Sequence, residues 1–216
     1  MKKYIVLTVL FALPICAYLF FASGVNSFVK LPTVTPNVPE LPKWKTLHGE
    51  NVQLREKITI LGFPGTEFVK EKGNQFNLQQ KIYDKNKSFQ DFQVVMVLPV
   101  GLENDAKTIK AELARISDMT SWHYVFAKPE EIQSYYAQLK LVGQLNANAA
   151  TANVFIIDKD RNLRGRKGKN KKGEQEYKEG YNTISAADLH NEMSDDVKII
   201  LAEYRLALKR NNKRKI

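Results

Sequence analysis

The chain has 216 residues, of which 44% are hydrophobic and 26% are charged, and its formal net charge is +10. This length allows one domain with a sizeable core, and the composition excludes a wholly disordered chain. Cys16 is the single cysteine, so a disulfide framework and a cysteine-rich zinc site are both excluded.

The chain begins with an apolar segment. Lys2 and Lys3 precede the largely apolar residues 4–22, which as a helix would be about 28 Å long, close to the hydrocarbon thickness of a bilayer. The apolar part of a secretory signal is usually shorter, at about 7–15 residues. We therefore expect residues 1–24 to be an uncleaved transmembrane anchor, with a cleaved signal as the alternative. The two lysines predict a single pass through the inner membrane, with the rest of the chain in the periplasm.

A proline-rich stretch follows the apolar segment. Four of the eight prolines lie in residues 31–42, LPTVTPNVPELP. Proline fixes φ and removes a hydrogen-bond donor, so we expect residues 25–46 to form a stiff, extended linker. The remaining chain is then divided into a domain over residues 47–210 and a basic tail over residues 211–216.

Two apolar segments predict the first strands of a sheet. Residues 57–63 contain a β-branched run, and residues 92–99, FQVVMVLP, are apolar throughout. A continuous apolar run of this length is typical of a central parallel strand that is covered on both faces. Between the two strands we expect a helix over residues 67–83, although Gly73 weakens this prediction.

The second half of the chain alternates helices and strands in the same way. The expected elements, in order, are a helix over residues 106–116 capped by Asn104 or Asp105, a strand over 124–126, a helix that begins at Pro129, a strand over 154–158, a turn over 159–162 and a partner strand over 163–166.

The clearest helical pattern lies near the C-terminus. Its apolar residues recur at spacings of three and four, and they are Leu189, Met193, Val197, Ile200, Tyr204 and Leu208. Ser185 with Asp188 resembles a capping box, and Ile184 against Leu189 would form a hydrophobic staple. The adjacent Asp195 and Asp196 point about 100° apart on a helix, so we expect both on the solvent face.

This order of elements predicts an α/β fold. Three alternating strands and helices are followed by a hairpin and a final helix, and the apolar strand over residues 92–99 needs helices on both faces. The arrangement is that of a thioredoxin-like, three-layer fold, in which a central mixed sheet lies between two layers of helices.

The residues of this region also resemble a known family. From about residue 50 to 210 the chain is similar to the Sco/SenC-like branch of thioredoxin-fold proteins, as a membrane-anchored member of Bacteroidetes type. The resemblance is carried by ITILGFPG at residues 58–65, FQVVMVLPV at 92–100 and TANVFIIDKDRNLRGR at 151–166. It implies an extracytoplasmic location and a role near the assembly of respiratory oxidases.

The copper ligands of that family are absent from this chain. Sco-type proteins bind copper through a CxxxC pair after the first strand and a histidine before the hairpin strand. Here the loop after the strand has no cysteine, and residues 143–153 contain no histidine. The proline that many thioredoxin-fold proteins carry before the hairpin strand is also missing, so we expect the Thr151–Ala152 peptide bond to be trans.

The loop after the first strand remains a candidate binding site. It consists of Gly62, Phe63, Pro64, Gly65 and Thr66. Thiol redox chemistry is excluded here because there is no thiolate to act as the nucleophile. Backbone N–H groups at the start of a helix could still hold an anion or the carbonyl group of a partner. The alternative is a strand-to-helix turn without any chemistry.

Two further patterns carry weaker functional hypotheses. His190 and Met193 are three residues apart, a spacing that would offer a soft metal one nitrogen and one thioether, although Met193 also fits the apolar stripe. Residues 159–172 hold eight basic residues and the single acid Asp160, which suits anionic lipid, an acidic protein or simply a solvated loop. The aromatic residues of a nucleic-acid platform are not interleaved with these charges.

We therefore expect a membrane-tethered, extracytoplasmic, thioredoxin-like protein without redox cysteines. It would be a non-enzymatic interaction or accessory module with no cofactor, and its partners would be the membrane and either a protein or an anionic lipid surface, not nucleic acid. The alternative is a copper carrier or respiratory oxidase assembly factor of Sco type that uses non-cysteine ligands.

Overall fold

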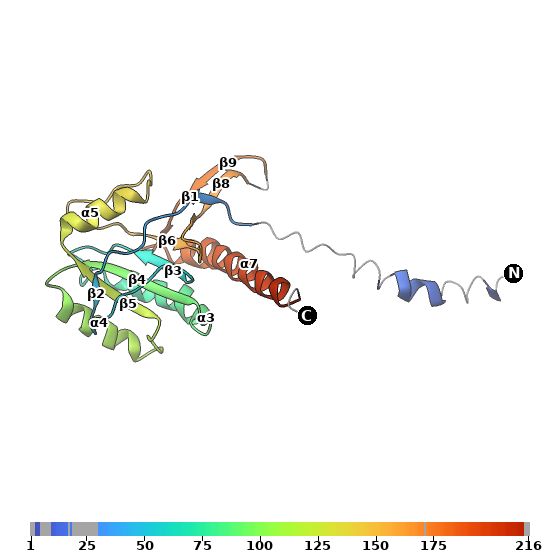
Figure 1. Ribbon diagram of the computed structural model, residues 1–216, viewed down its shortest axis with the longest axis horizontal. Helices are drawn as coiled ribbons and strands as arrows, with labels where there is room; N and C mark the ends of the chain where they lie inside the picture. The colour runs from blue at the N-terminus through green and yellow to red at the C-terminus, as the bar shows by residue number, and fades with distance from the viewer. Residues whose placement is uncertain (1–2, 5–9, 17, 19–29, 171, 214–216) are drawn as a thin grey trace.

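The structure is a computed structural model that describes residues 3–4, 10–16, 18, 30–170 and 172–213, with the backbone alone for residues 207–213 (Figure 1). Within these ranges, no helix is both long enough and apolar enough to cross a membrane. Much of the expected anchor and half of the expected basic tail, residues 214–216, lie outside the described residues, so both stay predictions.

An eight-stranded mixed sheet forms the centre of the domain. Its strands follow the order β1-β7-β6-β3-β4-β5-β2, and β10 also pairs with β6. Their bounds are β1 Thr33–Thr35, β2 Lys45–Thr46, β3 Ile58–Gly62, β4 Phe92–Pro99, β5 Trp122–Ala127, β6 Asn153–Ile157, β7 Leu163–Arg164 and β10 Tyr181–Asn182. Strands β3, β4 and β5 are parallel, whereas β6 runs antiparallel to β3.

Strand β4 is an interior strand of the sheet, between β3 and β5 and parallel to both, as its sequence predicted. All eight of its residues are buried. Successive side chains enter opposite cores, because Val94 and Met96 belong to one apolar cluster whereas Val95 and Val97 belong to the other. β-Branched residues suit this position, since they pack well on a pleated surface that is covered on both sides.

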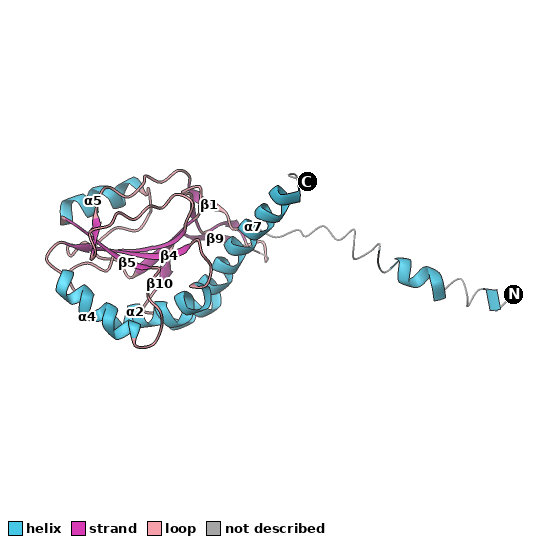
Figure 2. Ribbon diagram, turned by 60° about the horizontal axis from the view of Figure 1, so that its bottom comes forward, coloured by secondary structure: helices cyan, strands magenta, loops and turns pink. Residues whose placement is uncertain are grey.

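Helices cover both faces of the sheet and complete the three layers (Figure 2). One face carries α5, and the other carries α2, α4 and α7. Their bounds are α2 Lys72–Leu78, α4 Glu103–Ala114, α5 Pro129–Gln138 and α7 Ser194–Lys213. Helix α2 continues through a π-helical turn, Gln79–Tyr83, into α3, Asp84–Asn86, and α7 is preceded by α6, Ala186–Asp188, and a second π-helical turn, Leu189–Met193.

The expected linker is part of the domain from residue 31 onward. Strands β1 and β2 join the sheet at its opposite edges, and Val38, Leu41 and Trp44 are buried beside α5. The Trp44 ring lies edge-on to Tyr135, with 5.3 Å between the ring centroids. The linker prediction was wrong here because apolar residues between the prolines cover the sheet. All described members of both apolar clusters lie at or after Leu31.

A buried charge cluster joins this N-terminal segment to the turn between β6 and β7 and to helix α7. Arg164 Nη1 donates to Asp158 Oδ2 over 2.8 Å, and Arg164 Nη2 donates to Glu203 on α7 over 3.0 Å. The Leu31 carbonyl accepts from Arg164 Nε over 2.8 Å, and the Leu31 N–H donates to Glu203 over 3.0 Å. Asp158 also accepts from the Asn162 N–H, which fixes the turn between β6 and β7.

Two helix starts differ from the sequence predictions. The first helix begins at Lys72 instead of Glu67, because residues 66–71 form turns. Helix α4 begins at Glu103, so Leu102 is its N-cap residue and neither Asn104 nor Asp105 caps it. Ile116 was expected on the apolar face of that helix, but it lies beyond the helix end and is 56% exposed.

The start of the C-terminal helical segment is partly as predicted. Ser185 Oγ accepts a hydrogen bond from the Asp188 N–H, which confirms the cap. Ile184 is 61% exposed while Leu189 is buried, so the expected hydrophobic staple is not formed. Asp195 is exposed, as expected. Asp196 is instead buried, because the hairpin described below packs against it.

Candidate functional site

The loop after β3 is anchored by Phe63. This side chain is buried and meets the rings of Tyr136 and Phe155 edge-on, with 5.2 and 6.4 Å between centroids. Pro64 is half-buried and Thr66 is exposed. Of the five residues predicted as a binding loop, Phe63 therefore serves the core, and Pro64 and Thr66 present side chains nearer the surface.

A second loop, residues 146–151, holds the first one in place. The Thr151 N–H donates to the Phe63 carbonyl over 2.9 Å, and the Thr66 N–H donates to the Asn148 carbonyl over 3.2 Å. Gly65 has φ +69, and a Cβ there would overlap the Asn148 carbonyl oxygen and lie 2.5 Å from Ala150 Cβ. Glycine is required at this position because both the backbone angle and the close approach exclude a side chain.

The sequence predicted that the loop over residues 62–66 lies at the N-terminus of a helix, and the structure shows that it does not. Helix α2 begins at Lys72, six residues after Thr66, and the Thr66 N–H already has an acceptor. The predicted use of helix N-terminal N–H groups for an anion is therefore not supported by this geometry. The binding role of the loop depends instead on the cavity beside it.

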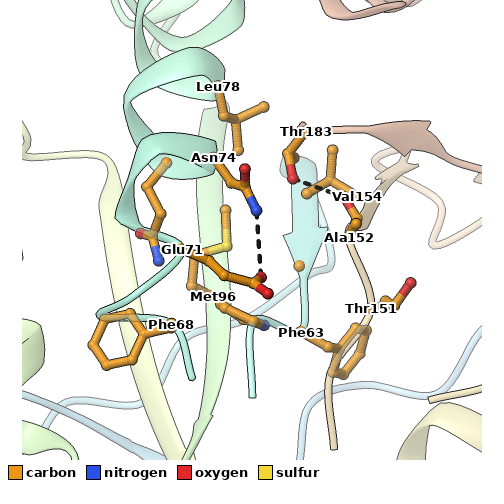
Figure 3. Close-up of a pocket in the computed structure, with 13 residues that line it drawn as sticks. Phe63, Phe68, Glu71, Asn74, Leu78, Met96, Thr151, Ala152, Val154 and Thr183 are labelled. Atoms are coloured by element: carbon orange, nitrogen blue, oxygen red, sulfur yellow. Dashed lines mark hydrogen bonds between the residues drawn. The ribbon is translucent and has the colours of Figure 1, made fainter. Parts of the chain in front are cut away.

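That cavity has a volume of about 30 Å³ and lies between α2 and the start of β6 (Figure 3). Its walls are mostly apolar, and the residues that line it are Gly62, Phe63, Pro64, Phe68, Glu71, Asn74, Gln75, Leu78, Met96, Thr151, Ala152, Val154 and Thr183. A Cβ on Gly62 would lie 2.5 Å from Met96 Sδ, so the glycine at the end of β3 lets the methionine occupy this position. The space suits about two water-sized groups, and hence the end of one small side chain.

Gln75, which lines this cavity, has an unsatisfied donor. Its side chain is 4% exposed, and its Oε1 accepts a hydrogen bond from Tyr124 Oη over 2.6 Å. Its Nε2 has no hydrogen-bond partner. Burial raises the pKa of Tyr124, so this hydroxyl stays protonated and remains a donor. A buried polar group without a partner costs about 1–3 kcal/mol, which a bound acceptor would recover.

The other polar groups around the cavity already have partners. Thr183 Oγ1 donates to the Ala152 carbonyl over 2.7 Å, and Asn77 Nδ2 donates to the Thr183 carbonyl over 3.1 Å. Asn74 Nδ2 contacts Glu71 Oε2 at 3.4 Å. Among the residues that line the cavity, Gln75 therefore has the buried donor without a partner. Across the described residues every peptide bond is trans, which confirms the prediction for Thr151–Ala152.

The side chains of His190 and Met193 lie in different environments, one exposed and the other buried. Met193 is 0% exposed and belongs to the core under the sheet, whereas His190 is exposed and its Nδ1 lies 3.4 Å from Lys85 Nζ. The thioether therefore fills the apolar stripe, which was the alternative interpretation of the pattern. Within the described part of the chain, no group of three histidine, cysteine, aspartate or glutamate residues is placed to hold a metal ion.

Sequence reasoning identified the loop but missed Gln75, Met96 and Thr183. A signal for Gln75 was present, since it lies three residues before Leu78 and seven after Phe68, on the buried side of the segment. A polar residue at a core position needs a partner or a function. Thr183 lies 121 residues after Gly62 in the chain (183 − 62), and no local pattern brings them together.

Comparisons with known proteins identify the fold. Neither a family model nor a curated protein matches the sequence. Among solved structures, a Sco/SenC family lipoprotein from Bacillus anthracis aligns with a TM-score of 0.53 at 13% identity, over 80% of this chain and 99% of that one. BsSco, a Sco-family cytochrome c oxidase assembly protein described as having a disulfide switch, aligns with a TM-score of 0.52 at 14% identity, over 79% of this chain and 98% of that one. The chain therefore has the thioredoxin-like fold of Sco/SenC proteins, with Cys16 as its single cysteine.

Proposed function

We propose that this protein is a membrane-tethered, extracytoplasmic binding module that holds a partner protein at the cavity beside residues 62–66. The partner inserts a small apolar side chain into the cavity and offers a neighbouring carbonyl group to Gln75 Nε2. No bond is made or broken in the partner. The module would position the partner, for example during the assembly of a respiratory complex.

The orphaned amide of Gln75 is the observation that carries this proposal. A folded chain gains nothing from burying a donor without an acceptor, and the same position filled by leucine would pack with the surrounding apolar residues. The cavity walls supply apolar contact from Phe68, Leu78 and Met96, while Gln75 supplies one directional hydrogen bond. Mostly apolar walls with one placed polar group are the usual composition of a binding pocket.

Sequence and similarity support the non-redox character and the location. Cys16 lies in the apolar N-terminal segment, far from residues 62–66 in the chain, so the loop has no thiolate of its own. The apolar residues 4–22 have the length of a membrane span. The Bacillus anthracis structure of similar fold is a lipoprotein, and a lipoprotein is held at a membrane surface by its acyl chains.

The copper alternative has less support. It requires a set of soft ligands that converge on one point, and Met193 is enclosed in the core while His190 is exposed. A histidine and a methionine would also leave a metal with an incomplete set of ligands. We therefore place protein binding ahead of metal carriage.

Site-specific photocrosslinking tests the proposal. A photoreactive phenylalanine analogue at Thr66, which is exposed in the loop, should give a discrete adduct when the full-length protein is irradiated in its own membranes. The matched control carries the analogue at Lys107, an exposed residue of α4 that does not line the cavity. An adduct from Thr66 alone supports docking at the loop, whereas equal labelling from both positions, or from neither, would contradict it.

A further inference from the structure

Residues 166–178 form a β-hairpin instead of the solvated loop that their charge allowed. Strand β8, Arg166–Lys169, pairs with β9, Gln175–Lys178, in a separate two-stranded sheet that extends from the domain (Figure 1). Lys167 is paired with Tyr177, and Lys169 with Gln175. Because side chains alternate along a strand, these four residues share one face of the hairpin, and Arg166, Glu176 and Lys178 share the other.

Acidic residues of the domain bind the inner face of the hairpin. Arg166 Nε donates to the buried Asp196 over 2.8 Å, and its Nη1 lies 3.3 Å from Glu176 and 3.4 Å from Glu192. Lys178 Nζ pairs with Glu192 over 2.8 Å and also with Asp188. Tyr181 Oη donates to Asp196 over 2.6 Å. The inner-face cations are therefore neutralised, and the hairpin is fixed to the helical segment over residues 186–196.

The outer face remains positively charged. Lys167 and Lys169 on this face, and Lys172 in the turn at the tip, are exposed, and none of them forms an ion pair with a described residue. Tyr177 lies among them and is 49% exposed. The hairpin has two carboxylates, of which Glu176 is paired inward and Glu174 accepts a hydrogen bond from Asn170 at the tip. The outer surface thus combines unpaired lysines with one exposed aromatic ring.

The N-terminal segment enters the domain at the base of this hairpin. The Gly165 N–H, one residue before β8, donates to the Pro32 carbonyl over 3.0 Å. Leu31 also contacts Glu203 on α7, whose C-terminal end lies on the same side of the domain as β8 and β9 (Figures 1 and 2). Eight residues, 23–30, separate the apolar segment from Leu31, and they can span at most about 28 Å. A membrane anchor would therefore keep the hairpin close to the bilayer surface.

We propose that the outer face of the β8–β9 hairpin binds the anionic headgroups of the bilayer in which the chain is anchored. This inference rests on the membrane tether of the proposed function and adds the orientation of the domain. Lysines attract acidic phospholipids, and tyrosine is enriched at the level of the headgroups. With the hairpin against the membrane, residue 31 faces the bilayer and the domain is held in one orientation relative to it.

Vesicle binding tests this surface without the anchor. The fragment over residues 30–216 contains every described member of both apolar clusters, so it is the probe that we use. We expect it to co-sediment with vesicles of equal parts phosphatidylglycerol and phosphatidylcholine, but not with phosphatidylcholine alone, and to be released by salt. The variant K167Q/K169Q/K172Q should lower the partition coefficient about 100-fold, since each lysine near an anionic surface contributes about a fivefold factor.

The control variant is K43Q/K45Q/K107Q, which removes the same charge from exposed lysines elsewhere. Lys43 and Lys45 lie at the β2 edge of the sheet, opposite the edge that leads into the hairpin, and Lys107 lies on α4. We expect this control to retain most of the binding. No binding to the anionic vesicles, or an equal loss in both variants, would overturn the proposal. Binding to soluble polyglutamate without binding to vesicles would also overturn it, by identifying an acidic protein as the partner.

The tether itself is tested separately on the full-length chain. Retention in the membrane pellet after alkaline carbonate extraction is expected for wild type and for K167Q/K169Q/K172Q alike. Extraction of both would contradict the tether, whereas the vesicle assay alone decides whether the hairpin binds headgroups.

Discussion

Tyr124 Oη donates a hydrogen bond to Gln75 Oε1 over 2.6 Å, while Nε2 of the same Gln75 amide has no partner. The two buried side chains join strand β5 to helix α2, and they leave one donor of Gln75, a residue that lines the cavity, without an acceptor. This arrangement stabilises the free protein less than an apolar pair would. In the function that we propose, an acceptor on the bound partner completes this site.

Replacing both members of this pair should hardly affect the fold. The double variant Gln75→Met with Tyr124→Phe removes the donor and the acceptor together, so we expect its free energy of unfolding to lie within about 1 kcal/mol of wild type. Tyr124→Phe alone should lower it by about 1–3 kcal/mol, because Gln75 Oε1 then also loses its partner. Urea denaturation of the four proteins forms a double-mutant cycle. If the losses in the free energy of unfolding of the two single variants add up in the double variant, the side chains of Gln75 and Tyr124 do not interact as the structure shows.

Two glycine-to-alanine substitutions should have opposite effects on the stability of the domain. Gly65→Ala places a Cβ against Asn148 and Ala150 at a positive φ, so we expect a loss of about 2 kcal/mol or more in the free energy of unfolding. Gly73 lies in α2 with open space around its Cβ position, and Gly73→Ala should raise the same quantity by about 0.5–1 kcal/mol. Thermal denaturation distinguishes the two. Equal stability of both variants would mean that the two loops are not packed as described.

His123 should make the domain less stable in mild acid. Burial, reinforced by the positive charge of Lys110, lowers the pKa of this imidazole from 6.5 to about 4. Above pH 6.5 the imidazole is neutral in both the folded and the unfolded chain, so it does not change the free energy of unfolding. Between about pH 6.5 and pH 4 the unfolded chain binds a proton that the folded chain does not, so stability falls with decreasing pH, by up to about 3 kcal/mol in total.

The substitution His123→Gln isolates this contribution. Free energies of unfolding measured at closely spaced pH values should fall more steeply for wild type than for the variant between about pH 6.5 and pH 4. The carboxylates titrate in both proteins and cancel in the comparison. Parallel curves over this range would show that His123 is protonated in the folded domain.

Copper titration should give no stoichiometric site. We expect the fragment over residues 30–216 to bind Cu(I) no better than exposed histidines do, in calorimetry with a competing chelator. Met193 is enclosed in the core, and the described residues include no group of three histidine, cysteine, aspartate or glutamate side chains placed to hold a metal ion. A one-to-one site of submicromolar affinity that is lost in His190→Ala with Met193→Ala would restore the copper carrier.

The sequence predicted the layers of the fold because its strong patterns are local. The continuous apolar run of β4, the proline at the start of α5 and the apolar spacing of α7 each specify an element from neighbouring residues. The order of these elements then leaves few possible sheets. The Sco/SenC resemblance rested on local segments too, residues 58–65, 92–100 and 151–166, and the solved structures of similar fold agree with it.

These local patterns do not predict which segments that are far apart in the chain pack against each other. The prolines of residues 31–46 indicated an extended segment, which is correct locally, but only the tertiary structure shows Trp44 against Tyr135. Charge density in residues 159–172 left a solvated loop as one interpretation, whereas Arg166 and Asp196 pair across 30 positions in the chain. The cavity likewise gathers side chains from segments that are far apart in the chain, so its one strong sequence signal was the polar Gln75 at a buried position.

The most direct test of the docking site combines the crosslinker with the cavity variant. The photoreactive analogue is placed at Thr66 of the full-length protein, in wild type and in Gln75→Met with Tyr124→Phe, and the adduct is quantified in native membranes at equal protein levels. We predict that the double variant unfolds at nearly the wild-type urea concentration and yields little or no adduct. An undiminished adduct from a stably folded double variant would contradict the claim that Gln75 and its cavity hold the partner.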